Sequence, residues 1–409
     1  MKKAIFAASF DTIHYGHINL IERALNVFDH LIVAVGSNPK KTYTFSQEER
    51  IAQVQKVLSR FADRVTVNSY PGLLADFAYE NEVKTIIRGA RNSNDFDFER
   101  MLSDINMGFK QELDTYILVA DQKLSHISSS AVKELQLNHA SNLTEYVPLV
   151  IKQALEERIS GQYLLGVTGG IGSGKSFVSK SILNLLPKNS KENLAFHHID
   201  MDEIGRYILK ESNEPIHKTV RSTIASTLNI STSANDLSAR DDKINITLLL
   251  HLMFDDIDAE SARAEFDRIM FEPMMHMVRK KIIGLKGVIL LNSALFVEAK
   301  ICNFVNNNFV LVKCSEETRM ARLKKRNYTD KQIENRLKAQ LSTEEKAKAI
   351  QNLIKEHSCG SLIEFTNEDK SQCNLLRDAI LNVFMGNYGD TKHVMIDPYS
   401  IEPSLVLAD

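Results

Sequence analysis

The chain has 409 residues, of which 44% are hydrophobic and 25% charged, and its formal net charge at pH 7 is -2. This length exceeds one ordinary core and indicates two or three domains. The nearly neutral balance excludes a global basic field that would attract nucleic acid or anionic membrane, so any phosphate must be held by local groups. The four cysteines lack CxxC spacing, which favours reduced thiols over a structural zinc site or a disulfide framework.

The opening segment MKKAIFAASF superficially resembles a signal peptide, but Asp11 ends its apolar run and no secretory context follows. We interpret it as a buried strand. The longest apolar stretch elsewhere, near 287–297, is too short and too interrupted to span a bilayer. The sequence therefore predicts a soluble, cytoplasmic protein that binds neither membrane nor nucleic acid.

Short β-rich runs alternate with helical patterns over the first 120 residues or so. Between the first two runs, apolar residues from Leu20 to Phe28 recur at helical spacing, so one face of that helix should pack on a sheet. Alternation of this kind implies a parallel sheet with crossover helices. The predicted strands are 4–9, 31–35, 65–68, 85–87 and 116–119.

A second α/β unit begins with a strand at 163–168, followed by a glycine-rich loop and an amphipathic helix. Residues 210–285 are predicted to be mostly helical, with a polar break at 231–242. Further strands are predicted at 196–200, 287–292, 309–313 and 362–365.

A closing helix at 151–159 and a short hinge at 160–162 indicate the domain boundary. The sequence therefore predicts a first domain over 1–160 and a second over 161–386. The segment 387–409 carries Gly, Pro and Asp without periodicity, and we expect an irregular or disordered tail there.

His14 and His17 lie three residues apart at the first turn of a predicted helix and therefore face the same side. Free backbone N–H groups and the helix dipole favour anions at that end, and the imidazoles can bond phosphate oxygens without being charged. From the spacing alone, helix capping or surface polarity is an equally good interpretation.

Further polar residues follow successive predicted strands: Lys40 and Lys41, then Arg88 and Arg91, then the serines at 128–130. Scattered cations would more often form a solvated surface. However, open α/β sheets bind ligands at the carboxyl ends of their strands. The placement therefore favours a convergent phosphate pocket.

The segments ASFDTIHYGH, NPKKTYTF, GLLADFA, IIRGARNSNDFDFE and ISSSAVKEL resemble bacterial phosphopantetheine adenylyltransferase across nearly all of residues 1–159. Cytidylyltransferases and nicotinamide mononucleotide adenylyltransferases share HxGH, but usually carry an ISTxxR-like segment where this chain has ISSSAVK. The resemblance implies an HxGH nucleotidyltransferase domain with a Rossmann-like parallel sheet. It also implies transfer of AMP from ATP to 4′-phosphopantetheine, giving dephospho-CoA and pyrophosphate, and assembly into a homo-oligomer through this domain.

The same resemblance implies the roles of residues in the first half. The catalytic set would be His17, Lys41, Arg88 and Arg91, and phosphopantetheine would be held by Ser9, Lys41, Leu74 and Arg88. ATP, with its Mg²⁺, would meet Ser9, Phe10, His14, His17, Gly89, Ala90, Arg91, Glu99, Leu124, Ser125, His126, Ile127, Ser128, Ser129 and Ser130.

Several residues of the first half depart from the family pattern. Ala8 stands where the family usually has Gly, Ser9 where it has Thr, Thr12 where it has Pro, and Leu124 where it has Trp. These changes concern affinity more than chemistry.

The segment GGIGSGKS at 169–176 satisfies G-x-x-x-x-G-K-[ST], with the required strand before it and helix after it. In such a loop, backbone amides cradle the β-phosphate, Lys175 reaches the β- and γ-oxygens, and Ser176 ligates Mg²⁺. A glycine-rich turn without a ligand is the weak alternative in this context. The sequence therefore predicts a nucleotide site.

Two further segments add polar groups to this second half. Asp200 and Asp202 follow the next predicted strand, where a carboxylate can orient or deprotonate an attacking hydroxyl or help to hold the metal. Acidic residues at a helix start are also ordinary capping. Arg322, Arg326 and Arg336 lie on a charged helical segment, which is either a solvated face or a mobile lid over ATP.

The loop, the IDxDxxxR segment, the arginine-bearing segment with RxxxQ and the closing LIEFTN resemble dephospho-CoA kinase over about 163–385. The resemblance implies a P-loop kinase domain with a helical insertion and a lid. With Mg²⁺, it would transfer the γ-phosphoryl group of ATP to the ribose 3′-hydroxyl of dephospho-CoA. Asp202 would be the base, Lys175 and Arg326 would also be catalytic, and ATP would meet Gly170, Gly172, Ser173, Gly174, Lys175, Ser176, Phe177, Arg326 and Arg336.

Three departures from this family pattern lie on the acceptor side. The usual LDR is INI, ending at Ile246, the usual HP is Glu272-Pro273, and the usual DxPLLFE is NSALFVE, beginning at Asn292. These changes point to weakened or altered handling of dephospho-CoA rather than of ATP.

The leading hypothesis is a bifunctional α/β enzyme that catalyses the last two steps of coenzyme A biosynthesis, since the product of the first half would be the substrate of the second. The first alternative is an active adenylyltransferase fused to a catalytically impaired, nucleotide-binding regulatory P-loop module. The second alternative keeps two activities but changes the nucleotidyl acceptor of the first site.

Overall fold

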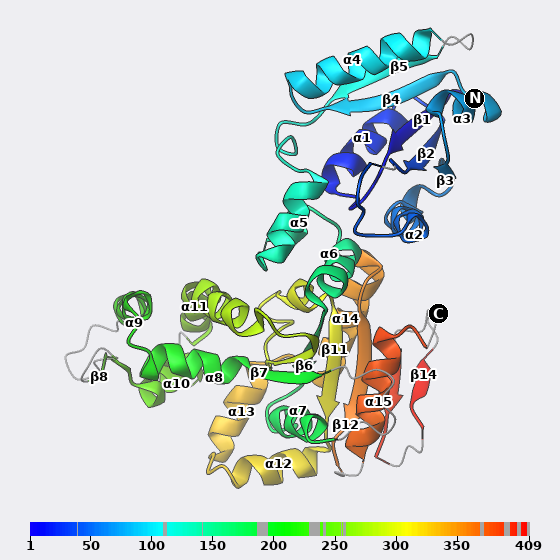
Figure 1. Ribbon diagram of the computed structural model, residues 1–409. Helices are drawn as coiled ribbons and strands as arrows, with labels where there is room; N and C mark the ends of the chain where they lie inside the picture. Colours follow the sequence, from blue (N-terminus) through cyan, green and yellow to red (C-terminus); the bar gives the residue numbers. More distant parts are fainter. Residues whose placement is uncertain are drawn as a thin grey trace. The chain divides into compact units, whose positions relative to one another are not determined.

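The chain divides into two compact units, Met1–Ile159 and Ser160–Asp409, each drawn in Figure 1. At the boundary, helix α6 (Leu149–Leu155) continues into a π-helical turn over Glu156–Ser160. The computed structural model describes residues 1–38, 40–108, 113–140, 142–185, 195–228, 238–239, 243–254, 256, 259–368, 372–387, 393–398 and 402–406.

The first unit is built on a five-stranded parallel sheet in the order β3-β2-β1-β4-β5. Each strand predicted in this half is present. Because β1 pairs with β2 on one side and β4 on the other, the chain reverses direction of winding at β1, and a crevice opens at its carboxyl end. The strands are β1 (Lys3–Ala8), β2 (His30–Gly36), β3 (Val65–Tyr70), β4 (Thr85–Ala90) and β5 (Asp114–Val119).

Helices cover both faces of this sheet, and β1 shows why. Its residues alternate: Ala4 and Phe6 belong to one apolar cluster, with helices α1, α2, α5 and α6, whereas Ile5 and Ala7 belong to the other, with α3. The helices are α1 (Tyr15–Leu25), α2 (Gln47–Val57), α3 (Leu74–Glu80), α4 (Ser93–Met107) and α5 (Ser129–Leu137), with short 3₁₀ turns at Ser59–Phe61 and Leu143–Glu145.

The second unit contains a seven-stranded sheet in the order β14-β13-β12-β11-β6-β10-β7. All neighbours are parallel except β13 and β14. All six residues of β10 are buried, as expected for a parallel strand covered on both faces. The strands are β6 (Gln162–Thr168), β7 (Phe196–Asp200), β10 (Gly287–Asn292), β11 (Asn308–Lys313), β12 (Ser361–Thr366), β13 (His393–Ile396) and β14 (Ser404–Val406).

Helices make up most of the remaining second unit, and Figure 1 shows a group of them, α8 to α11, beside strand β7. The predicted helical region 210–285 is present in the part that the structure describes, while most of the predicted break at 231–242 lies outside it. The elements are α7 (Lys175–Leu183), α8 (Met201–Arg206), a π-helical turn (Tyr207–Glu211), α9 (Pro215–Thr227), a small β8 (Ser238–Ala239) and β9 (Lys243–Ile244) pair, α10 (Ile246–Phe254), α11 (Ala259–Ile282), a 3₁₀ turn (Cys302–Val305), α12 (Glu316–Lys324), α13 (Asp330–Lys338), α14 (Thr343–His357) and α15 (Cys373–Phe384).

The expectation of an irregular tail after residue 386 needs correction, because β13 and β14 extend the second sheet. Val394 and Ile396 are fully buried, and the imidazole of His393 lies 2.6 Å from the carboxylate of Glu364 on β12. Strands of four and three residues are too short for the alternation that identifies a strand in sequence.

None of the helices in the described ranges has the length and hydropathy needed to cross a bilayer.

Two candidate active sites

A cavity of about 340 Å³ opens at the carboxyl ends of β1 and β4 in the first unit. Its wall combines the end of β1, the first turn of α1, the end of β4, the start of α4 and the start of α5. The predicted site residues that line it are Ser9, His14, His17, Lys41, Arg88, Gly89, Arg91, Glu99, Leu124, Ile127, Ser128 and Ser129.

Other predicted residues of this half do not line the cavity: Phe10, Leu74, Ala90, Ser125, His126 and Ser130. Phe10 is buried beneath His17, with the two ring centroids 5.1 Å apart. The His126 ring instead packs edge-on against Tyr146, with centroids 5.7 Å apart. Phe10 therefore supports the site from below, while His126 contacts a residue outside the cavity.

The two histidines form a stacked pair, with ring centroids 3.7 Å apart. Burial, and then the nearby Arg91 charge, lower the pKa of His14 to about 4. Burial, His14 and Arg91 hold the pKa of His17 well below its usual value. Both rings are therefore neutral at pH 7, and a neutral imidazole can still bond a phosphate oxygen.

Hydrogen bonding indicates which nitrogen of His17 carries the proton. The backbone N–H of His14 donates to Nδ1 of His17 at 3.4 Å. A neutral ring that accepts at Nδ1 has its proton on Nε2. His17 can therefore donate a hydrogen bond from Nε2 to a phosphate oxygen.

Arginine side chains at the end of β4 are held by carboxylates. Nε and Nη2 of Arg88 donate to both carboxylate oxygens of Glu99, at 2.6 and 2.7 Å, and Nη1 donates to the Ala7 carbonyl at 2.6 Å. Arg91 Nε donates to Asp95 at 3.0 Å. Both acidic residues of the cavity lining are thus bonded to arginines, which leaves the lining cationic.

Asp11 anchors the loop that carries Lys41, and the sequence interpretation assigned it no role. Its buried carboxylate accepts hydrogen bonds from the backbone N–H groups of Thr44 and Phe45, at 3.0 and 3.2 Å, and from Nζ of Lys133 at 2.8 Å. Burial tends to raise the pKa of Asp11, but these donors lower it overall. The only sequence signal was its position inside ASFDTIHYGH.

The second site is the loop between β6 and α7, at the centre of the seven-stranded sheet. Gly174 has φ of 95°, and a Cβ atom there would lie 2.3 Å from Nδ2 of Asn367. That amide nitrogen donates to the Ser173 carbonyl at 2.8 Å. Glycine is required here by both backbone conformation and space. The predicted residues Gly170, Gly172, Ser173, Gly174, Lys175, Ser176 and Phe177 form this loop and the first turn of α7.

Charged side chains converge on this loop. Nζ of Lys175 donates to the carbonyls of Gly169 and Gly170, at 3.0 and 3.1 Å. Burial lowers the pKa of Lys175 to about 8, so it remains mostly protonated at pH 7. The pKa of Asp202 is raised, first by partial burial of its carboxyl and then by the Asp200 carboxylate, although the residue as a whole is exposed.

Ser176, in the first turn of α7, and Asp200, at the end of β7, form a pair of oxygen groups. The Ser176 hydroxyl donates to Oδ2 of Asp200 at 2.9 Å. Hydroxyl and carboxylate oxygens are ligands that Mg²⁺ prefers, so these residues fit such an ion. Among the described residues there is no cluster of three or more His, Cys, Asp or Glu side chains arranged for a metal.

The arginine-bearing helices meet the loop through a different arginine from the two predicted. Nη1 of Arg322 donates to the Ser173 carbonyl at 2.9 Å. Arg326 is exposed, although its charge reaches Lys175. Arg336 stacks between Phe254 and Tyr328, 4.7 and 4.8 Å from their ring centroids.

The three departures on the acceptor side lie in different environments. Ile246 begins α10, and Glu272 lies on α11 with its side chain 72% exposed. Asn292 is buried at the end of β10, in register with Asp200 of β7, and its Oδ1 accepts a hydrogen bond from Ser179 at 2.7 Å. Only Asn292 lies against the P-loop helix.

A larger cavity of about 730 Å³ begins at Asp200 and continues along β7, α8 and the end of α11. Its lining carries negative charge from Asp200, Glu203 and Glu211, positive charge from Arg206 and Lys281, and apolar surface from Met277 and Leu285. Its size and mixed chemistry suit an elongated molecule with polar and apolar parts.

Comparison with known proteins was consistent with this division. Residues 5–135 match the cytidylyltransferase-like family, and residues 163–360 match the dephospho-CoA kinase family. The chain is 37% identical to the phosphopantetheine adenylyltransferase of Leptospira biflexa, over 38% of this chain and 97% of the relative. It is 36% identical to the enzymes of the same name from Geotalea daltonii, over 39% and 98%, and Thermotoga neapolitana, over 38% and 96%.

Proposed function

Because the first half of the chain belongs to the phosphopantetheine adenylyltransferase family and the second half carries a dephospho-CoA kinase domain, we propose that the protein makes coenzyme A from 4′-phosphopantetheine in two steps. The observation that carries the proposal is the presence of two phosphate-binding corners, each at the carboxyl end of a central parallel strand. The product of the first reaction is the substrate of the second.

In the first reaction, a phosphate oxygen of phosphopantetheine attacks the α-phosphorus of ATP, and pyrophosphate leaves. No enzyme nucleophile is needed, so the residues position the reactants and stabilise charge. His17, through Nε2, and Lys41 bind oxygens around the α-phosphate, Arg88 binds phosphopantetheine and Arg91 binds ATP. Since both carboxylates of the lining are paired with arginines, the phosphates of ATP would hold Mg²⁺ in this site, where the ion would neutralise phosphate charge.

In the second reaction, the ribose 3′-hydroxyl of dephospho-CoA attacks the γ-phosphorus of a second ATP. Asp202 accepts the hydroxyl proton, and its raised pKa suits a base. Lys175 and Arg326 bind the phosphates. Ser176 and Asp200 would hold Mg²⁺, which neutralises phosphate charge when bound.

The large cavity beside Asp200 provides room for the acceptor. Arg206 and Lys281 would bind the diphosphate, while Met277 and Leu285 would contact the pantetheine arm. The regulatory-module alternative is not favoured, because residues 163–360 of this unit match the dephospho-CoA kinase family. Lys175, Ser176 and Asp202 are also all present on the ATP side. We place both reactions in the cytoplasm.

We also propose that the protein is a homo-oligomer through its first unit. Exposed apolar side chains line α4 and β5: Phe96, Phe98, Met101, Ile105, Tyr116 and Val119. An apolar group of this kind is typical of a protein interface. Light scattering should give a mass above that of one chain, and Ile105→Asp should reduce it.

The test of the proposed function is product analysis. Purified protein supplied with ATP, Mg²⁺ and phosphopantetheine should release pyrophosphate and form CoA. Dephospho-CoA that accumulates without CoA would reject the kinase step, and the regulatory-module alternative would then hold. Pyrophosphate release with a different acceptor, but not with phosphopantetheine, would favour the other nucleotidyl acceptor.

A further inference from the structure

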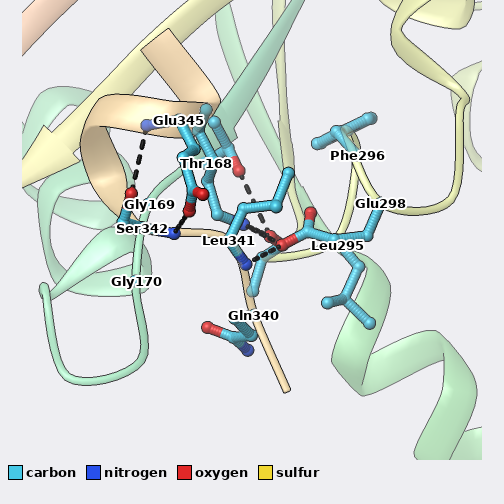
Figure 2. Close-up of polar contacts among 12 residues, drawn as sticks. Thr168, Gly169, Gly170, Leu295, Phe296, Glu298, Gln340, Leu341, Ser342 and Glu345 are labelled. Atoms are coloured by element: carbon cyan, nitrogen blue, oxygen red, sulfur yellow. Dashed lines mark hydrogen bonds and ion pairs between the residues drawn. The ribbon is translucent and has the colours of Figure 1, made fainter. Parts of the chain in front are cut away.

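A buried ion pair lies behind the P-loop, between Lys346 and Glu298. The Lys346 side chain is fully buried, and its Nζ lies 2.6 Å from Oε1 of Glu298. Nζ also donates to the carbonyl of Ala294. Oε1 of Glu298 accepts a second hydrogen bond, at 3.1 Å, from the backbone N–H of Leu341, as Figure 2 shows.

The pair joins three segments of the second site. Ala294 and Glu298 belong to the loop after β10, which carries the acceptor-side segment NSALFVE. Leu341 lies in the connection between α13 and α14, at the base of the arginine-bearing helices. Lys346 lies in the first two turns of α14, whose start is capped by Ser342 and Glu345.

Two of these segments, the acceptor loop after β10 and the connection between α13 and α14, also contact β6 or the P-loop that follows it. The Gln340 side chain, next to Leu341, accepts a hydrogen bond at 3.2 Å from the backbone N–H of Ile171. Thr168, the last residue of β6, donates from its hydroxyl to the Ala294 carbonyl at 3.5 Å. The end of β6 therefore touches the acceptor loop and the P-loop touches the lid base, and the ion pair links these two points to each other.

Stability alone gives a weak reason for such a pair. The free-energy cost of removing two charges from water is about as large as the attraction between them. A well-packed apolar pair in the same place is often as stable. In addition, Oε2 of Glu298 is buried without a hydrogen-bond partner among the described residues. The contacts of the pair connect the acceptor loop to α14 and to Leu341, but they leave one carboxylate oxygen of Glu298 unsatisfied.

We propose that Glu298 and Lys346 are positioning residues of the kinase site, which hold the acceptor loop at a set distance from the P-loop and the lid base. The inference rests on the proposed kinase function. Neither side chain contacts the reacting atoms. The P-loop itself is held independently by Asn367 and Arg322, so loss of the pair should leave nucleotide binding intact and displace the acceptor.

The test compares Glu298→Gln, Lys346→Met and the double variant in the full-length protein. Each single change leaves one buried charge without its partner and should lower the melting temperature. The double variant removes both charges and should recover it. However, kcat/KM for dephospho-CoA should stay reduced by about 10- to 100-fold in all three variants. The reason is that a small displacement of the acceptor hydroxyl from the γ-phosphorus lowers the rate of transfer steeply. The dissociation constant of MgADP, measured by calorimetry, should stay within about twofold.

The matched control is the exposed pair of Glu334 and Lys338 on α13, which are 2.6 Å apart. Glu334→Gln with Lys338→Met should change neither the melting temperature nor kcat/KM for dephospho-CoA. A double variant of the buried pair that regains full kcat/KM together with its stability would overturn the inference, as would MgADP binding weakened in proportion to kcat/KM. If the Lys346 variants do not fold, the test uses Glu298→Gln alone. This variant should then have a reduced kcat/KM for dephospho-CoA and an unchanged dissociation constant for MgADP. Inactive wild-type protein would reject the proposed function and this inference together, whereas active wild type with unaffected variants would reject this inference alone.

Discussion

The two phosphate-binding corners of this chain, one after β1 and one after β6, are expected to bind phosphate through different chemical groups. In the first, non-glycine residues take the left-handed turn, with φ of 48° at Phe10 and 96° at Thr12, and two neutral imidazoles face the cavity. In the second, glycines take the turn, with φ of 142° at Gly169 and 95° at Gly174, and the expected phosphate ligands are backbone groups of the loop.

The difference shows how each site depends on the rest of its unit. A loop whose ligands are backbone groups takes its turn from glycines within one short segment, although Asn367 and Arg322 also hold its Ser173 carbonyl. A site whose ligands are side chains on several strand ends needs those ends held together by distant contacts, such as Asp11 with the Thr44 N–H group. The first corner should therefore be sensitive to changes outside its motif, and the second to changes within it.

The largest expected effect separates the two sites. Lys175→Ala should reduce phosphorylation of dephospho-CoA by about 10²–10³-fold, because it removes the ammonium that binds the phosphates. Pyrophosphate release should be unchanged, and dephospho-CoA should accumulate. His17→Ala should do the reverse, and supplied dephospho-CoA should still be converted to CoA. Loss of both reactions in either variant would mean that the units are not independent.

Gly174→Ala tests the claim that the second corner depends on its own backbone. The new Cβ would clash with Asn367 and occupy a strained φ, so the free energy of unfolding should fall by about 1–3 kcal/mol and MgADP should bind more weakly. The control is Gly205→Ala on α8, where no atom lies within 4 Å of the added Cβ. This control should stabilise the protein by up to about 1 kcal/mol. Equal destabilisation by both changes would contradict the assignment.

The neutral histidines predict a pH dependence that belongs to the first corner. Because the pKa of folded His14 is about 4, the unfolded chain binds more protons than the folded one between about pH 6.5 and pH 4. The free energy of unfolding should therefore fall as the pH falls through this window, by up to about 3 kcal/mol from His14. Denaturant unfolding of wild type and His14→Gln should show a flatter profile for the variant. Parallel profiles would contradict neutral burial.

The smallest effect tests strain in the first corner. Thr12 is fully buried, its φ is 96°, and its hydroxyl has no hydrogen-bond partner in the part of the chain that the structure describes. Thr12→Gly should raise the free energy of unfolding by about 1 kcal/mol, because relief of strain exceeds the loss of a few contacts. Thr44→Gly in the same region, where φ is not positive, should lower it by about 0.5–1 kcal/mol. Thermal melts that rank the two variants in the opposite order would remove the argument for strain.

Much of the fold could be predicted because its signals are local. Each strand with a run of five or more apolar or β-branched residues was visible, and GGIGSGKS identified the second site from one segment. The strands β13 and β14 escaped prediction because they are too short to show a period. Their place in the sheet depends on pairing with β12, which only the folded chain reveals.

The site residues could be predicted less completely, for the same physical reason. His17 and Lys175 lie in recognisable motifs, but the role of Asp11 depends on backbone groups more than 30 residues away. Arg322 was on the predicted lid, yet nothing in the sequence shows that it, rather than Arg326, bonds to the P-loop carbonyl of Ser173. The Glu298 and Lys346 pair is separated by 48 residues and carries no periodic signal.

The most direct test of the central claim follows two labels through the whole protein. With phosphopantetheine, Mg²⁺ and ATP labelled at both the α- and γ-phosphorus, the account predicts CoA that carries α-label in its diphosphate and γ-label on the ribose 3′-oxygen, in equal amounts. Product with α-label alone would contradict a two-step synthesis by one chain.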